Sequence, residues 1–123
     1  MSYLEELKEF YPLDLYAFSR GLTEGEFTVL KNLRKVLEEK VKPVINEHWE
    51  KAEFPFEAFG EIAKVGVMNS SLLFEGRKGK RKPSELYNAF LYLELAKLDA
   101  SIATFYTVHG GLCYNTILMG GSE

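Results

Sequence analysis

Residues 86–98 read LYNAFLYLELAKL, and this stretch decides the fold class. Only Asn88, Glu94 and Lys97 are polar there. At about 100° per residue, the apolar side chains of a helix with this sequence go almost all the way round, so it needs cover on more than one side. The following residues, 102–119, are also apolar or weakly polar on every face. We therefore predict an all-α chain in which these two successive helices carry more apolar surface than one small core covers.

A long helix is predicted to begin at Thr23. The Thr23 hydroxyl can accept the third helical N–H while the Glu26 side chain reaches back, which is a capping box. Pro43 must kink or split this helix near Val41 and Lys42, because proline removes a helical hydrogen bond. The apolar positions recur at intervals of three and four, so one face is buried. They are Phe27, Leu30, Leu33, Leu37, Val41, Val44 and Ile45.

A further helix is expected to start at Pro55, which suits the first helical position. Its inner face should consist of Phe59, Ile62 and Ala63. Gly66 can end it in a left-handed cap. Short connections of this kind predict an antiparallel helical bundle of about four to six helices.

The ends of this bundle are also suggested by the sequence. Residues 1–20 are expected to form an N-terminal arm with a short helix that packs on the body, because Pro12 disfavours helix in the residue before it. Residues 21–123 are expected to form the helical domain. Five cations surround one glycine in residues 77–82, a composition typical of a solvated loop, and the next helix begins at residues 83–85.

Composition excludes several classes of protein. The net charge of −3 gives no reason to expect nucleic acid as a partner. Cys113 is the only cysteine, so neither an intramolecular disulfide nor a thiolate metal cluster is possible, and no metal site is expected. Residues 100–122 lack Asp, Glu, Lys and Arg, but their glycines, His109 and hydroxyls are too polar for a membrane helix. The start of the chain shows no targeting pattern, so we expect a location in the cytoplasm or the mitochondrial matrix.

Four side chains that could carry chemistry are expected to have structural roles instead. We expect His48 on a helix surface and His109 in the core or at a pocket edge with a hydrogen bond. Glu94 is expected to pair with Lys97, three residues on. Cys113 is expected to be an inert buried thiol. No glycine-rich phosphate cradle precedes a helix, so no independent nucleotide site is predicted.

Several fragments, in this order and spacing, are similar to the acyl-CoA dehydrogenase family. Together they cover roughly residues 20–123. The fragments are Leu22-Thr23-Glu24, Val41-Lys42-Pro43-Val44, Phe54-Pro55, Ala63-Lys64-Val65-Gly66, residues 95–104 (LAKLDASIAT), residues 108–115 (VHGGLCYN) and Gly121-Ser122-Glu123.

The resemblance implies that this chain is the amino-terminal helical domain of an FAD-dependent acyl-CoA dehydrogenase. A central β-domain and a carboxy-terminal helical domain, which supplies the catalytic glutamate, would complete the enzyme. Flavin and acyl-CoA lie where the parts meet. The implied partners are the acyl-CoA substrate, the remaining domains and further copies in a homo-oligomer. No catalytic residue is therefore expected in this chain, and its FAD contacts stay unassigned.

The resemblance also implies a substrate-binding stripe of Thr104, Val108 and Leu112, whose spacing puts them on one helical face. Their size would help set which acyl chains fit; a purely structural core role is the alternative. Glutaryl-type members place an arginine beside this stripe. Ala103 stands there instead, which favours monocarboxylic chains. The loop of residues 74–80 also departs from the family pattern, which suggests a degenerate or a specialised member.

Two other functions remain open on the residues alone. The same apolar faces would suit a free-standing helical module that dimerises or binds a partner protein. A small lipid or acyl carrier would instead use the Thr104 stripe and bind fatty acyl groups without flavin.

Overall fold

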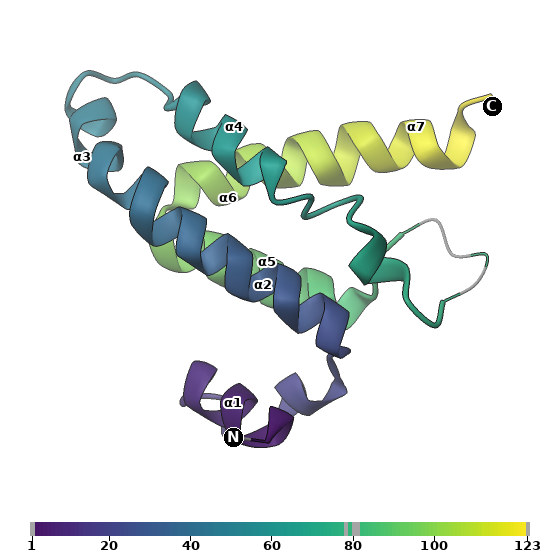
Figure 1. Ribbon diagram of the computed structural model, residues 1–123. Coiled ribbons are helices and arrows are strands. Elements are labelled where there is room, and N and C mark those ends of the chain that lie inside the picture. Colours follow the sequence, from purple (N-terminus) through teal and green to yellow (C-terminus); the bar gives the residue numbers. More distant parts are fainter. Residues whose placement is uncertain (1, 78, 80–81, 123) are drawn as a thin grey trace.

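The computed structural model describes residues 2–77, 79 and 82–122, and within them all the regular secondary structure is helical, with no strand (Figure 1). The bounds of the α-helices are α1 Tyr3–Phe10, α2 Glu24–Val36, α3 Lys42–Glu50, α4 Phe56–Lys64, α5 Glu85–Leu98, α6 Ala100–Tyr106 and α7 Asn115–Gly120. Two short 3-10 helices, η1 (Phe18–Gly21) and η3 (Ser71–Phe74), lie in the connections. The predicted all-α fold class is confirmed.

Two π-helical segments join neighbouring helices end to end. One is η2 (Leu37–Val41), between α2 and α3, and the other is η4 (Thr107–Tyr114), between α6 and α7. Their wider turns are seen where the N–H of Lys42 donates to the carbonyl of Leu37, five residues back. Pro43 follows at once and has no N–H to continue the ordinary pattern. The seven described α-helices therefore make five continuous ones, within the predicted range, and the irregularity falls where Pro43 predicted it.

The two longest α-helices, α2 and α5, lie side by side and run in the same direction (Figure 1). Near their starts the Ser84 hydroxyl donates to the Glu26 carboxylate at 2.6 Å. Further along, Arg34 of α2 binds Glu94 of α5. Consecutive helices do turn back: α4 runs against α2, and α6 runs against α5 (Figure 1). After α4, residues 66–77 return along α2, where η3 packs on it, and α5 begins beside the start of α2, so α2 and α5 are parallel.

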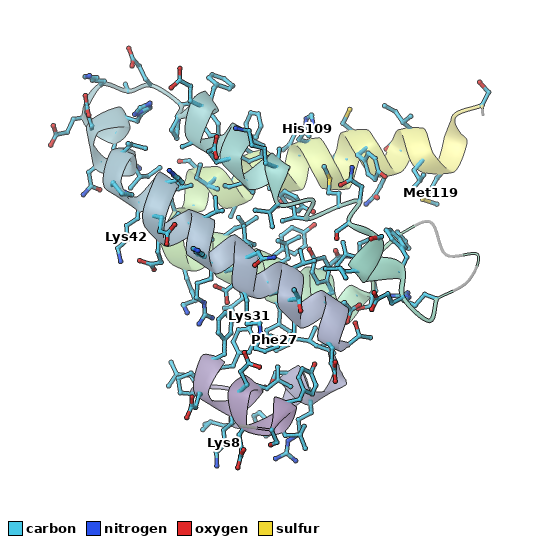
Figure 2. The ribbon with its side chains drawn as sticks, viewed as in Figure 1. Lys8, Phe27, Lys31, Lys42, His109 and Met119 are labelled. Atoms are coloured by element: carbon cyan, nitrogen blue, oxygen red, sulfur yellow. The ribbon has the colours of Figure 1, made fainter. Side chains whose placement is uncertain are left out.

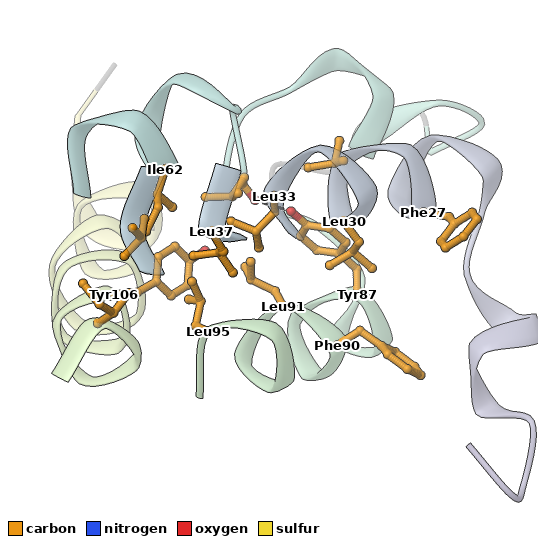
Figure 3. Close-up of a cluster of buried hydrophobic side chains, with 14 of the residues drawn as sticks. Phe27, Leu30, Leu33, Leu37, Ile62, Tyr87, Phe90, Leu91, Leu95 and Tyr106 are labelled. Carbon is orange, nitrogen blue, oxygen red and sulfur yellow. Dashed lines mark hydrogen bonds between the residues drawn. The ribbon is translucent and has the colours of Figure 1, made fainter. Parts of the chain in front are cut away.

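The core lies between these helices (Figure 3). Leu30, Leu33 and Leu37 face Leu91 and Leu95, and all five are at most 3 % exposed. Every position of the predicted inner face of α2 to α3 is buried except Val44, which is half-buried. The inner face of α4 was predicted less well. Ile62 is buried as predicted, but Ala63 is exposed. The second buried residue of α4 is Ala58, one turn before Ile62.

Helix ends follow the sequence signals closely. The Thr23 hydroxyl accepts from the Glu26 N–H at 3.1 Å, and the Glu26 carboxylate accepts from the Thr23 N–H at 3.0 Å, so the capping box is confirmed. Gly66 has a φ of 76° and ends α4 as predicted. Pro55 is not the first helical residue; it lies one position outside, at the N-cap of α4. Its ψ of 68° is not helical, because the chain is still turning from Phe54.

The N-terminal segment contains the predicted short helix, α1 (Figure 1). Its inward side chains Leu7 and Tyr11 are 1 % and 7 % exposed. The Tyr3 hydroxyl donates to the Leu22 carbonyl at 2.8 Å, and Lys31 of α2 pairs with Glu6 at 2.7 Å. These contacts fasten α1 to the body. The division into an arm of residues 1–20 and a domain of residues 21–123 stays a prediction.

Candidate functional site

The helix formed by α6, η4 and α7 buries only a narrow stripe. Ile102, Tyr106 and Gly110 are buried at intervals of four, while most of the remaining surface is open. No Asp, Glu, Lys or Arg occurs in residues 100–122. Figure 2 shows this helix extending away from the body, with the labelled His109 and Met119 on it. Leu112, Ile117 and Met119 are 67 %, 65 % and 84 % exposed. An uncharged, largely apolar helix surface is thus left uncovered.

The three predicted substrate-binding residues lie on this open surface. Thr104 is exposed, and Val108 and Leu112 are 52 % and 67 % exposed. The four-residue spacing places them along one side of the helix, clear of the buried stripe. The structure therefore brings them together as an open wall, and the alternative that they are core residues is wrong. Their contact with an acyl chain stays a prediction.

The threonine hydroxyls on this helix differ in their hydrogen bonds. The Thr107 hydroxyl donates to the Ala103 carbonyl at 2.9 Å, and the Thr116 hydroxyl donates to the Leu112 carbonyl. Among the described residues, the Thr104 hydroxyl has no hydrogen-bond partner. It is therefore the hydroxyl of this stripe that is available to a ligand, whereas Thr107 and Thr116 satisfy their own helix.

An aromatic cluster that sequence reasoning missed lies next to this wall. Phe105 of α6 stacks on Phe54 with ring centroids 4.5 Å apart, and Phe59 of α4 meets its edge, also at 4.5 Å. The His109 ring also lies nearly parallel to the Phe105 ring, with ring centroids 6.1 Å apart. The signal was the run of phenylalanines around Pro55. His109 is exposed, so its predicted core or pocket-edge position is wrong; it lies off the buried stripe of Ile102, Tyr106 and Gly110.

Gly110 allows the last helix to approach the loop after α4. A Cβ at this position would lie 3.0 Å from the Met68 sulfur and 3.3 Å from the Tyr106 ring. Beside it is a polar cleft of about 160 Å³, whose walls include Asn88, Tyr92 and Tyr106. Burial raises the pKa of the Tyr106 phenol above its ordinary range, so it stays protonated and uncharged.

The buried carboxylate Glu94 does not pair with Lys97 as predicted. It is 3 % exposed and binds Arg34 through both oxygens, with N–O distances of 2.9 and 2.5 Å. Arg34 reaches it from the neighbouring helix α2, where its planar guanidinium can make two parallel bonds that a lysine cannot. Burial, and then the Glu94 carboxylate, raise the pKa of the Tyr11 phenol well above its ordinary value. This pair stabilises the packing of α2 on α5.

Other single-residue predictions had mixed outcomes. Cys113 is exposed, so the prediction of a buried thiol is wrong; position 113 lies off the buried stripe of the last helix. His48 of α3 is half-buried rather than on the open surface, with its Nδ1 buried and unpartnered in the described part of the chain. In the basic loop, positions 78, 80 and 81 lie outside the described residues. Arg77 lies 3.6 Å from Glu26 there, so it is not simply solvated.

Across residues 2–77, 79 and 82–122, no helix is long and apolar enough to cross a membrane. The same residues contain no group of three or more His, Cys, Asp or Glu side chains that could hold a metal ion.

Comparison with known proteins identifies the region that contains the wall. A family model described as "Acyl-CoA dehydrogenase, N-terminal domain" matches residues 23–123. Neither a curated protein nor a solved structure matches the chain. The matched residues include α2 to α7 and therefore all three stripe residues, while α1 and η1 lie outside the match.

Proposed function

Because the chain belongs to the acyl-CoA dehydrogenase family through its amino-terminal domain, we propose that it forms one wall of an acyl-CoA dehydrogenase site. The reaction is α,β-dehydrogenation of an acyl-CoA thioester. A base supplied by the carboxy-terminal domain removes the α-proton. Bound in the complete enzyme, FAD would supply the acceptor for the hydride that leaves the β-carbon. The part of this chain is to bind and orient the acyl chain and to exclude water from it.

The observation that carries this proposal is the uncovered helix of residues 100–120. Its exposed side contains Thr104, Val108 and Leu112. It carries no Asp, Glu, Lys or Arg that would have to be desolvated when an acyl chain covers it. Covering such a surface with an acyl chain and with protein removes apolar area from water. The remaining dehydrogenase domains are the proposed cover, and a homo-oligomer of the complete enzyme is part of the same proposal.

The last helix fits an acyl chain better than it fits FAD. The last helix offers apolar side chains and the Thr104 hydroxyl, but residues 100–122 contain no cation for a pyrophosphate. We therefore assign the acyl chain to the stripe and leave FAD contacts to the complete enzyme. Ala103, half-buried beside the stripe, presents no cation for a distal carboxylate, which supports a monocarboxylic acyl group.

The test compares the chain alone with a longer protein that includes any coding sequence found after residue 123. The extended protein should bind flavin, turn yellow and reduce a dye when acyl-CoA is added, whereas the chain alone should do none of these. Val108→Trp in the extended protein should fill part of the proposed acyl site. It should therefore lower kcat/KM for long acyl-CoA substrates more than for short ones. Thr107→Val, whose hydroxyl is bound to its own helix, is the matched control.

A free-standing interaction module is the second candidate, and the open apolar surface of the last helix favours it too. It predicts a defined, soluble oligomer of the chain alone, without flavin, and no active extended protein. That result would contradict the dehydrogenase proposal. Saturable binding of fatty acyl groups to the Thr104 stripe of the chain alone would instead favour an acyl carrier.

A further inference from the structure

A second apolar site lies at the opposite side of α5 from the last helix, outside the proposed acyl wall. The N-terminal segment and α5 enclose a groove of about 460 Å³. Its walls are mostly apolar and include Tyr11, Leu13, Leu15, Phe18, Phe90 and Leu93. This volume falls within the range of small-molecule sites, roughly 300–1,000 Å³. The segment that forms one wall lies before residue 23, outside the family match.

The wall formed by the N-terminal segment is held in place by hydrogen bonds. Asp14 accepts the N–H of Phe18 at 3.0 Å and the N–H of Ser19 at 2.7 Å. Arg34 donates to the Phe10 carbonyl at 2.9 Å. Ala17 has a φ of 56°, a left-handed conformation that is unfavourable for alanine. The groove is therefore organised before any ligand arrives, which lowers the entropic cost of binding.

This wall exposes apolar side chains instead of burying them. Leu13 and Leu15 are 89 % and 88 % exposed, and Phe18 is 63 % exposed. Tyr11 and Phe90, by contrast, form a buried floor with ring centroids 4.7 Å apart. An apolar ligand lying on this floor would cover side chains that the fold itself leaves in water.

One cation lies at the edge of the groove. Lys97 of α5 lines it and forms no ion pair with any described residue, because Glu94 is bound to Arg34. The other charged group there, Asp14, uses both its oxygens to bind backbone N–H groups. The groove therefore offers one available charge, and it is positive.

We propose that this groove binds a single-chain amphiphile with one carboxylate, of the fatty acid class. The tail lies between the N-terminal segment and α5, and the carboxylate pairs with the Lys97 ammonium. Binding here is independent of the proposed dehydrogenase function, since the groove shares no residue with the Thr104 stripe.

The test is calorimetric titration of the 123-residue chain with laurate and its shorter homologues, each below its micelle concentration. We expect saturable binding of one molecule per chain. Affinity should rise about fourfold for each added methylene while the groove still has room, as burial of a methylene predicts. Absence of saturable binding, or binding only above the micelle concentration, would overturn the proposal.

Variants locate the two ends of the ligand. Leu15→Asp should abolish laurate binding, while Met119→Asp, the same kind of change at an equally exposed position on the last helix, should leave it intact. Lys97→Met keeps the aliphatic stem and should weaken laurate about fivefold, as expected for one exposed ion pair. It should not change binding of dodecanol. Equal losses in both aspartate variants, or no effect of Lys97→Met, would contradict the proposed site.

Discussion

The pair of helices α2 and α5 and the helix of residues 100–120 differ in how much of their apolar surface is buried. Both are rich in apolar residues, yet α2 and α5 seal theirs into a core, while the last helix buries only one narrow stripe. The sealed contact also includes a buried charged pair, Arg34 and Glu94, whereas the open helix carries no charge. The core holds the described helices together, whereas the open helix is the surface that the proposed dehydrogenase domains would cover.

The sharpest way to test this comparison is to remove the same side chain from each region. Leu91 is fully buried and Leu112 is 67 % exposed. Leu91→Ala should lower the free energy of unfolding by about 3 kcal/mol, because it leaves a cavity. Leu112→Ala should change it by less than about 0.5 kcal/mol. Urea denaturation followed by circular dichroism measures both. Similar losses would mean that the last helix belongs to the core.

The buried charged pair offers a second test. Glu94→Gln leaves the Arg34 guanidinium without its counter-charge, and it should cost about 2 kcal/mol, less than for a fully buried pair since the Arg34 side chain is 25 % exposed. The surface pair of Glu38 and Lys42 is the control, because both side chains are more than half exposed. Glu38→Gln should not measurably shift the urea midpoint. If the two variants behaved alike, the Arg34 pair would not stabilise the α2 and α5 contact.

Replacing two glycines by alanine provides a third test, because the two changes should shift the free energy of unfolding in opposite directions. A Cβ on Gly25 of α2 would lie 2.3 Å from the Leu72 carbonyl oxygen, so Gly25→Ala should force the backbone of η3 away and destabilise the chain by about 1–2 kcal/mol. Gly60 of α4 has open space around it. Gly60→Ala should stabilise the chain by about 0.5–1 kcal/mol, because alanine favours helix. Thermal unfolding compares them; a stabilising Gly25→Ala would contradict the close packing of α2 on η3.

Much of the sealed region could be predicted from the sequence because its signals are local. The capping box at Thr23, the left-handed Gly66 and the buried spacing from Phe27 to Ile45 each depend on neighbouring residues. The partner of Glu94 could not be predicted in the same way. Arg34 is 60 positions away and becomes its neighbour only because α2 and α5 are parallel.

The open region shows the converse limit. Apolar periodicity predicted a helix over residues 102–119 and correctly indicated surface beyond one core, but it could not say which residues stay open. Cys113 and His109 were therefore placed in the interior, although the buried stripe is Ile102, Tyr106 and Gly110. The N-terminal groove was missed because its walls come from residues 10–18 and from α5, which no local pattern connects.

The most direct test of the central claim uses Cys113, the single cysteine, which is exposed next to Leu112 on the open helix. The rate at which a thiol reagent labels it should be measured in the chain alone and in the protein extended beyond residue 123, with and without acyl-CoA. We predict rapid labelling of the chain alone and strong protection in the extended protein, because the open helix becomes covered. Equal labelling rates in all three samples would contradict the claim that this helix is a wall of an acyl-CoA dehydrogenase site.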